Sequence, residues 1–189
     1  MSEIPKSIVR RTQWPTSVSQ PVVTPLQPSV VYASPDPDAL DAQYADASGF
    51  TYAREGHPNA AVLAQKIDML EGATGGIITG SGMSAIGAVF LGCLKAGDHV
   101  VGGDQLYGRT LRLMTTDLPK FGIETSLADP TDVDAIRAAI RPNTKMIVVE
   151  VVSNPTIRVA DMPAIIALAN EIGVLLVVDN TFTTPRSYR

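Results

Sequence analysis

The sequence is poor in the residues that build disulfide frameworks and metal centres. It contains one cysteine, Cys93, and two histidines, His57 and His99. A single cysteine excludes an intramolecular disulfide framework and fits a reducing compartment. With so few thiol and imidazole groups, we expect no metal site. The apolar neighbours of Cys93 predict a buried packing thiol rather than a nucleophile.

Long apolar runs and blocks of one charge are also missing. No stretch approaches the roughly 20 apolar residues of a membrane span, and the N-terminal residues 1–6 lack a signal-peptide pattern. The net charge is -4, and lysine and arginine form no block. This balance gives no reason to expect nucleic acid or an anionic membrane as a partner. We therefore expect a cytoplasmic protein.

Proline is concentrated near the N-terminus, at positions 5, 15, 21, 25, 28, 35 and 37. Prolines at this density exclude a long helix and interrupt strand ladders, so residues 1–50 are predicted to form an extended arm. Val22, Val23 and Leu26 make this segment too apolar for a simple solvated tail. The arm can lie across another subunit or pack locally, and the sequence leaves both possibilities open.

From Pro58 onward, short apolar segments alternate with helical patterns. Strands are predicted near residues 76–79, 99–101, 123–127, 145–152 and 174–178, and helices near 59–71, 83–95, 109–118, 132–140 and 161–172. We expect Asn59 to cap the first helix. The alternation is typical of an α/β fold with a mostly parallel sheet and flanking helices, here over residues 51–189.

A glycine-rich turn, Gly80-Ser81-Gly82, separates the first predicted strand from its helix. Such a turn lets the backbone approach a ligand, and the helix N-terminus offers free N–H groups to a phosphate. A plain strand–helix turn uses the same residues, and a nucleotide-binding α/β domain is another possibility. The glycine spacing is not that of a dinucleotide fingerprint, and the lysine of a P-loop is missing.

Two tyrosine motifs can contact a ligand. Arg54 can hold phosphate oxygens in a bidentate fork, and Tyr52 can donate a further hydrogen bond. The alternative is an exposed loop with a surface arginine. Tyr107 follows a strand and can stack on a flat heteroaromatic ring, although an ordinary packed tyrosine fits equally well.

Carboxylates end the two most apolar strands. Glu150 lies among valines and must face a polar site or a charge, while the nearby Asn154 can donate to a ring hydroxyl. An exposed strand end followed by a turn is the alternative for this pair. Asp179 can pair with a protonated pyridine nitrogen, and Thr181 can bond cofactor oxygens.

The order of these motifs is more specific than any one of them. Tyr52-x-Arg54, Ser81-Gly82-Met83, Tyr107-Gly108-x-Thr110, Glu150 with Ser153-Asn154-Pro155, and Asp179-Asn180-Thr181-Phe182 occur in that order. Over about residues 20–185 the sequence resembles the Cys/Met-metabolism family of pyridoxal-phosphate (PLP) enzymes, which includes cystathionine γ-synthase, cystathionine γ-lyase and O-acylhomoserine sulfhydrylases. The resemblance implies the large domain of the aspartate-aminotransferase type, PLP as cofactor, and a homo-oligomer, with paired dimers forming a tetramer.

The resemblance also implies how the cofactor phosphate and ring are held. Tyr52 and Arg54 would bind the phosphate in a neighbouring subunit's site, whereas Gly82 and Met83 would bind it in their own site. Tyr107 would stack on the ring and assist proton movement as a catalytic residue.

The remaining roles fall on the two strand ends. Glu150 and Asn154 would orient the ring and its hydroxyl, Asp179 would pair with the ring nitrogen, and Thr181 would support the cofactor.

The resemblance implies elimination or replacement chemistry on a homoserine- or cysteine-derived amino acid. We expect γ-replacement of the synthase or sulfhydrylase type, with a γ-lyase as the alternative. The family continues into a Ser-x-Thr-Lys motif whose lysine forms the Schiff base, whereas Arg186-Ser187-Tyr188-Arg189 follows Pro185 here. The expectation is a fragment that lacks this lysine and the C-terminal domain and is inactive alone; a non-catalytic remnant that binds partner subunits is the alternative.

Overall fold

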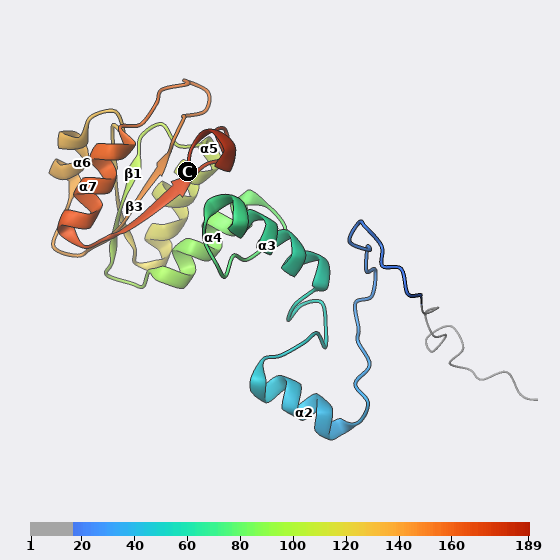
Figure 1. Cartoon of the computed structure of the whole chain (residues 1–189). Helices are drawn as coiled ribbons and strands as arrows, with labels where there is room; N and C mark the ends of the chain where they lie inside the picture. Colours follow the sequence, from blue (N-terminus) through green and yellow to red (C-terminus); the bar gives the residue numbers. More distant parts are fainter. Residues whose placement is uncertain (1–16) are drawn as a thin grey trace, which may run out of the picture. The chain divides into compact units, whose positions relative to one another are not determined.

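The computed structural model describes residues 17–189, and the first sixteen residues of the predicted arm lie outside this range. The chain divides into two compact units, Met1–Asn59 and Ala60–Arg189 (Figure 1). The second unit holds the whole sheet and the predicted strand-end residues, whereas Tyr52 and Arg54 belong to the first.

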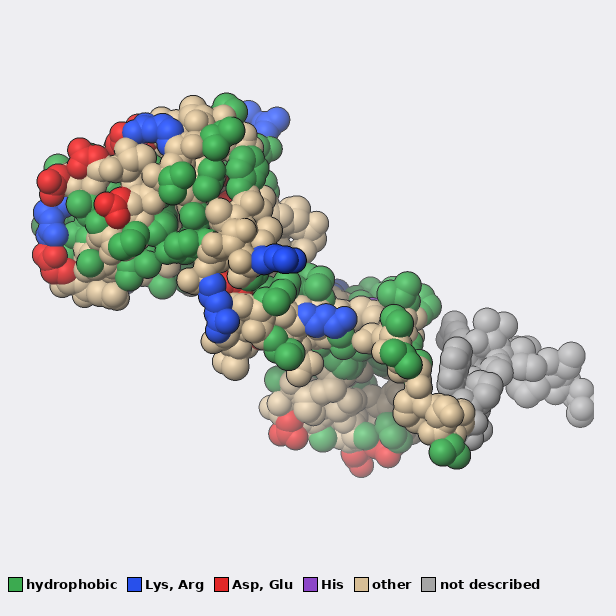
Figure 2. All heavy atoms as spheres, turned by 45° about the horizontal axis from the view of Figure 1, so that its top comes forward, with side chains coloured by type: hydrophobic (Ala, Val, Ile, Leu, Met, Phe, Trp, Pro, Cys, Tyr) green, Lys and Arg blue, Asp and Glu red, His purple; other side chains and the backbone are tan. Residues whose placement is uncertain are grey.

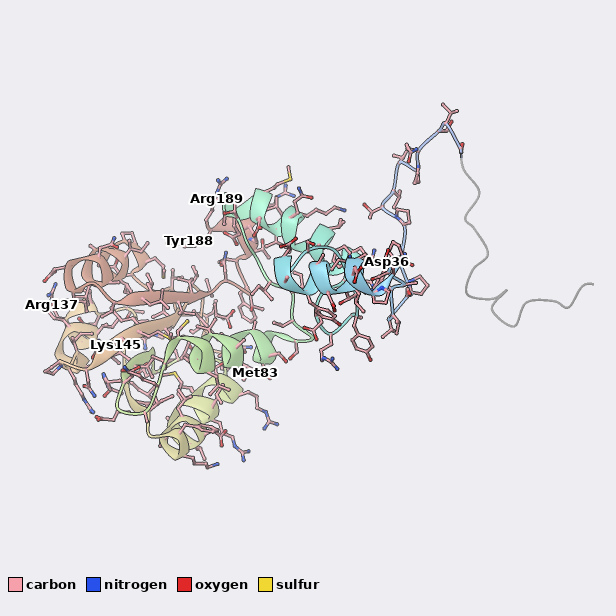
Figure 3. The ribbon with its side chains drawn as sticks, turned by 90° about the horizontal axis from the view of Figure 1, so that it is seen from below. Asp36, Met83, Arg137, Lys145, Tyr188 and Arg189 are labelled. Carbon is pink, nitrogen blue, oxygen red and sulfur yellow. The ribbon has the colours of Figure 1, made fainter. Side chains whose placement is uncertain are left out.

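Among its residues 17–57, the smaller unit contains one helix, α2 (Pro37–Asp46). The Asp36 side chain accepts a hydrogen bond from the N–H of Ala39 at 2.8 Å and so caps this helix (Figure 3). Pro37 occupies the first helical turn, where its missing N–H removes no intrahelical bond. The prediction of an extended arm is therefore wrong for these ten residues. Proline breaks a helix when it lies in the helix interior, but it favours a helix when it lies in the first turn.

A short antiparallel contact fixes the rest of the smaller unit. Val31 and Tyr52 form an isolated bridge, in which the N–H of Ala53 donates to Val30 at 2.8 Å. Val22 and Leu26 stay 103% and 89% exposed. Within residues 17–189, these two side chains of the arm therefore pack against no other hydrophobic residue.

Helix α3 (Pro58–Glu71) begins one residue earlier than the sequence predicts. The N–H of Asn59 donates to Nδ1 of His57 at 3.2 Å, so His57 rather than Asn59 serves the helix start. The Asn59 side chain instead bonds the backbone of Pro25 and Gln27. The predicted Asn59 cap is wrong because its amide pins the extended segment before the helix.

The larger unit is built on a four-stranded parallel sheet in the order β2-β1-β3-β4. Its strands are β1 (His99–Gly103), β2 (Glu124–Ala128), β3 (Thr144–Glu150) and β4 (Leu175–Asp179). Its helices are α4 (Gly82–Cys93), α5 (Gly108–Arg112), α6 (Val133–Ala139), α7 (Met162–Ile172) and the short α8 (Thr184–Ser187). The predicted parallel α/β fold is confirmed.

Helices cover both faces of this sheet (Figure 1). Ile147 and Val149 of β3 pack in one core with residues of α6 and α7, whereas Met146 and Val148 pack in the other with residues of α4 and the segment after α5. Because side chains alternate along a strand, Glu150 continues the series of Met146 and Val148. Its carboxylate therefore lies on the α4 side of the sheet.

In the larger unit, two predicted elements differ from the structure. Residues 76–79 form no strand, and Ile77 is 85% exposed. An apolar run becomes a strand only where it finds a ladder partner, and this segment pairs with none of the described strands. The predicted helix 109–118 is split into α5, a π-helical turn at Leu113–Asp117 and a 3-10 turn at Leu118–Phe121.

Hydrophobic side chains remain exposed at the surface (Figure 2). On the larger unit the exposed ones include Met69, Leu70, Ile77 and Leu91. Cys93 is exposed as well. The predicted burial of its thiol is wrong because α4 ends at this residue and Leu94, 8% exposed, enters the core instead. Among the described helices, none has the length and apolar character to cross a membrane.

Candidate functional site

A cavity of about 330 Å³ opens at the carboxyl ends of the strands. The chain proceeds from β1 to β2 on one side and then crosses to β3 on the other, so strand order reverses between β1 and β3. Parallel sheets bind ligands at such a switch point, because the loops leaving the two strands diverge there. The cavity is lined by Ser81, Gly82, Met83, Ile86, Tyr107, Thr110, Glu150, Val152, Asn154, Asp179, Thr181 and Phe182.

Glu150 lies at the end of β3 and is only 8% exposed. Its Oε1 accepts the backbone N–H of Tyr107 at 2.7 Å, and its Oε2 accepts the backbone N–H of Asn154 at 3.2 Å. Burial raises the pKa of Glu150 above its ordinary value, the Tyr107 N–H lowers it, and the nearby Asp179 carboxylate raises it. The expectation that this acid needs a polar partner is met by backbone amides rather than by a cation.

Asp179 lies at the end of β4, where it is the register partner of Glu150. Its Oδ1 accepts hydrogen bonds from the backbone N–H and the hydroxyl of Thr181. Among residues 17–189, Oδ2 receives no hydrogen bond. Asp179 is therefore held in place by one oxygen while the other remains able to bind a cationic partner.

The first turn of α4 lies on another wall of the cavity. Ser81 caps this helix by accepting the N–H of Ser84 at 3.1 Å, and Met83 follows in the first turn (Figure 3). The first N–H groups of a helix have no partner inside it and carry partial positive charge. A Cβ added at Gly82 would meet no protein atom within 4 Å, so the backbone there is open to a ligand.

Tyr107 immediately precedes α5, and its ring is 44% exposed. Thr110, 1% exposed, donates its hydroxyl to the sulfur of Met83 at 3.9 Å and joins α5 to the first turn of α4. The buried contact between Thr110 and Met83, one helical turn after Tyr107, thus helps to hold Tyr107 at the cavity.

Most of the predicted site residues therefore meet at this cavity. Gly82, Met83, Tyr107, Glu150, Asn154, Asp179 and Thr181 all line it. Tyr52 and Arg54 belong to the smaller unit, where the Arg54 guanidinium lies 4.9 Å from the Tyr52 ring centroid. Arg54 also pairs with Glu55 at 3.2 Å, with a largely exposed side chain.

Sequence reasoning missed several cavity residues. Ser81 and Thr110 lie inside motifs that were recognised, so their polar side chains were the available signal. Ile86, Val152 and Phe182 carry none, because an apolar residue that lines a cavity looks the same in the sequence as one that lies in a core.

The groups around the cavity fit PLP, which is a flat aromatic ring bearing a phosphate and a basic nitrogen. The α4 N-terminus can receive the phosphate, Tyr107 can contact the ring, and Asp179 can accept the protonated nitrogen. Within the described part of the chain, no lysine lines the cavity. Lys145 is the second residue of β3 and so lies near the opposite end of the strand from Glu150.

A parallel sheet covered by helices on both faces, with this set of groups at its switch point, defines the large domain of a PLP-dependent fold. The model of the Cys/Met metabolism PLP-dependent enzyme family matches residues 7–189. The chain therefore belongs to this family, whose cofactor is PLP, and the predicted family is confirmed.

Individual relatives agree with this assignment. The chain is 44% identical over 140 residues to cystathionine beta-lyase MetC of Bacillus subtilis (strain 168), covering 74% of this chain and 36% of that protein. It is 36% identical over 177 residues to a cystathionine gamma-synthase of Herpetosiphon aurantiacus that carries the qualifier "probable", covering 94% and 53%.

A solved structure extends the comparison to the fold. The metY protein of Campylobacter jejuni, assigned as an O-acetylhomoserine (thiol)-lyase, superposes with a TM-score of 0.81 at 32% identity, covering 86% of this chain and 40% of that one. Its structure contains N'-pyridoxyl-lysine-5'-monophosphate. The chain thus spans about 36% to 53% of the length of these relatives.

Proposed function

We propose that this chain holds PLP in the cavity at the ends of β1, β3 and β4, as the cofactor-binding part of an enzyme that acts on amino acids of cysteine and methionine metabolism. The observation that carries the proposal is the arrangement of three complementary groups around one cavity of about 330 Å³. A helix N-terminus, an exposed aromatic ring and a carboxylate with one available oxygen match the phosphate, the ring and the nitrogen of PLP.

Each residue has a distinct part in binding. Gly82 and Met83 would donate backbone N–H groups to the phosphate. Tyr107 would cover one face of the ring and, at its hydroxyl, hold or pass a proton. Asp179 would keep the ring nitrogen protonated, and Thr181 supports Asp179 through two hydrogen bonds to the same carboxylate oxygen. When bound, PLP supplies an electron sink for bonds broken at the substrate's α-carbon.

The reaction is elimination or replacement at the side chain of a homoserine- or cysteine-derived amino acid. The predicted γ-replacement stays a prediction. A lyase is the second candidate, because the chain is also 44% identical over 140 residues to the β-lyase. The substrate class is therefore proposed at the level of sulfur amino acids and their homoserine precursors.

Binding of PLP to this chain alone is proposed to be non-covalent. No described lysine lines the cavity, so no amine is available beside Asp179 for a covalent bond to the cofactor aldehyde. The chain alone is accordingly proposed to be inactive or nearly so.

The smaller unit is proposed to contact a second copy of the chain. Val18, Val22 and Leu26 are each at least 89% exposed, and such an apolar segment gains stability when another surface covers it. Tyr52 and Arg54 lie next to each other in this unit and would reach the phosphate of the copy's site. Val22→Asp together with Leu26→Asp should shift the sedimentation of the chain toward a smaller species.

The binding proposal is tested by adding PLP to the 189-residue chain and recording circular dichroism in the visible absorption band of PLP. Free PLP is not chiral, so a saturable signal reports an ordered site. Borohydride reduction followed by peptide mapping should show no single lysine labelled in preference to the others, because exposed lysines such as Lys120 react only non-specifically. Absence of a saturable signal, or stronger binding of a nucleoside triphosphate than of PLP, would reject the proposal.

A further inference from the structure

The walls of the cavity are formed by loops that diverge from neighbouring strands. Tyr107 ends the loop that leaves β1, and Asn154 belongs to the loop that leaves β3. Because strand order reverses between β1 and β3, the first loop proceeds toward α5 and the second toward the other face of the sheet. No main-chain hydrogen bond is described between Tyr107 and Asn154, so another group must set the distance between them.

Glu150 is that group. It is the last residue of β3, and its two carboxylate oxygens accept N–H groups from two different loops, at 2.7 Å from Tyr107 and 3.2 Å from Asn154. The side chain is 8% exposed, so these bonds form where water competes little. A buried carboxylate left without them would be strongly destabilised.

We infer that Glu150 is a positioning residue, which sets Tyr107 and Asn154 at the cavity wall through their backbone N–H groups and does not itself bind the cofactor. The inference rests on the proposed PLP site, because it assigns these two residues to that ligand. It differs from the sequence-based expectation that Glu150 orients the ring directly.

The neighbouring acid shows the contrast. Glu150 and Asp179 are register partners and line the same cavity. Asp179 uses Oδ1 for Thr181 and has Oδ2 available, whereas Glu150 uses both oxygens for the protein's own backbone. The two carboxylates therefore have different roles. Asp179 is available to the ligand, whereas Glu150 fixes the two loops that form the cavity wall.

Only a carboxylate of this length satisfies both N–H groups. The amide of Glu150→Gln keeps one acceptor oxygen, but its NH₂ group cannot accept the second N–H. Glu150→Asp keeps two acceptors on a shorter side chain. The glutamine variant should therefore free one loop, and the aspartate variant should bring the acceptors out of reach of at least one N–H.

A second contact between the same two loops provides a matched control. The Thr156 hydroxyl, in the loop after β3, donates to Oε1 of Gln105, in the loop after β1, at 2.7 Å. Neither residue lines the cavity. Thr156→Val removes a link between these loops without touching the N–H of Tyr107 or Asn154.

The first experiment needs no PLP. Amide proton shifts of Tyr107 and Asn154 are followed by NMR as pH is lowered in the unmodified chain. Both should titrate with one common midpoint, above that of an ordinary glutamate, since both report the same carboxyl group. In Glu150→Gln neither should titrate. Independent midpoints, or no titration of one amide, would overturn the bridge.

The second experiment asks whether the bridge serves the ligand. Relative to the unmodified chain, Glu150→Gln should bind PLP about 5-fold more weakly, the effect of one lost hydrogen bond, and with reduced visible circular dichroism. Thr156→Val should change neither. Equal PLP affinity and dichroism in Glu150→Gln and the unmodified chain would refute the positioning role.

The two arms separate the failures. If the unmodified chain binds no PLP while the amides titrate together, the proposed function fails and so does the positioning role, but the Glu150 bridge stands. If PLP binds and the amides titrate independently, the function stands and the inference fails.

Discussion

Glu150 and Asp179 are paired in register on the adjacent parallel strands β3 and β4, and their carboxylates lie on the same face of the sheet beside one cavity. Two like charges at neighbouring strand ends are unfavourable unless each finds a partner. Glu150 finds two backbone N–H groups within the chain, whereas one oxygen of Asp179 has no described partner. The pair therefore has room for one positive charge, on the Asp179 side.

Asp179→Asn should weaken PLP binding about 10- to 100-fold, because a charge-assisted hydrogen bond to the ring nitrogen becomes a neutral one. The measurement is a PLP titration followed by visible circular dichroism. The variant should remain folded, since asparagine can still accept the N–H of Thr181.

Asp134→Asn is the matched control for charge. Asp134 lies in the first turn of α6, away from the cavity, and the same loss of one negative charge there should leave PLP affinity unchanged. Equal losses in both variants would show that net charge, rather than contact with Asp179, controls binding.

Gly82→Ala should weaken PLP binding at least about fivefold while leaving the free energy of unfolding nearly unchanged. The added methyl group meets no protein atom within 4 Å, so folding does not oppose it. It would instead enter space that a ligand occupies, and overpacking of this kind costs about 1–3 kcal/mol. PLP titration and urea unfolding measure the two effects separately.

Gly87→Ala, on the same helix, serves for comparison. It also meets no protein atom within 4 Å, but it does not line the cavity. Removing a glycine from a helix interior should raise the free energy of unfolding by about 0.5–1 kcal/mol and leave PLP affinity unchanged. If Gly87→Ala also loses affinity for PLP, the Gly82→Ala result would come from a change in helix geometry rather than from contact between the added methyl group and the ligand.

Much of this site could be predicted from the sequence because its acids follow continuous apolar runs. The β-branched and aliphatic residues of β3 and β4 have little alternative to burial in a parallel sheet. A polar residue that directly follows such an apolar run is therefore expected at the carboxyl end of the strand. Glu150 and Asp179 could therefore be assigned to one edge of the sheet before any contact was known.

The partner of Glu150 could not be predicted, since a backbone N–H leaves no trace in the residue types of Tyr107 and Asn154. The same limit applies to residues 76–79, where an apolar run lacks a ladder partner among the described strands, and to α2, where Pro37 begins a helix. Each of these outcomes depends on what the rest of the fold places nearby.

His99 should make the stability of the chain depend on pH. It is fully buried, with Nδ1 2.7 Å from the Thr144 hydroxyl and Nε2 2.9 Å from the Ser126 hydroxyl. Burial lowers the pKa of His99 below 6.5, the Arg141 charge lowers it further, and Glu124 opposes them. The folded state thus binds fewer protons than the unfolded chain in the window below pH 6.5.

The sign follows from this difference. The stabilisation of the fold by neutral His99 is fully present above pH 6.5, the pKa of an ordinary histidine. It is lost as the pH falls toward the lower pKa that His99 has in the folded state. Urea unfolding between about pH 5 and about pH 8 should show this loss. His99→Gln should flatten the slope. A slope that persists unchanged in His99→Gln would reject the assignment.

Arg158→Gln should raise the pKa of Asp129. The Arg158 guanidinium donates to Asp129 at 2.6 Å, joining the loop after β3 to the loop after β2. This bond, followed by those from Thr131, lowers the pKa of Asp129 to about 2 from an ordinary 3.8. The ionised Asp129 carboxylate therefore stabilises the fold above pH 3.8, and this stabilisation is lost as the pH falls through about 2.

In Arg158→Gln the Thr131 bonds remain, so the pKa should rise only part of the way toward 3.8, and less stability should be lost over the acid range. Carbon-13 NMR of the Asp129 carboxyl measures the midpoint directly. Arg137→Gln breaks a comparable surface pair with Glu171 and should not move it. Since Arg158 and Asp129 are about one third exposed, added salt should reduce the difference between Arg158→Gln and the unmodified chain. Equal Asp129 midpoints in Arg158→Gln and the unmodified chain would mean that Asp129 is held by the Thr131 bonds of its own loop rather than by the arginine.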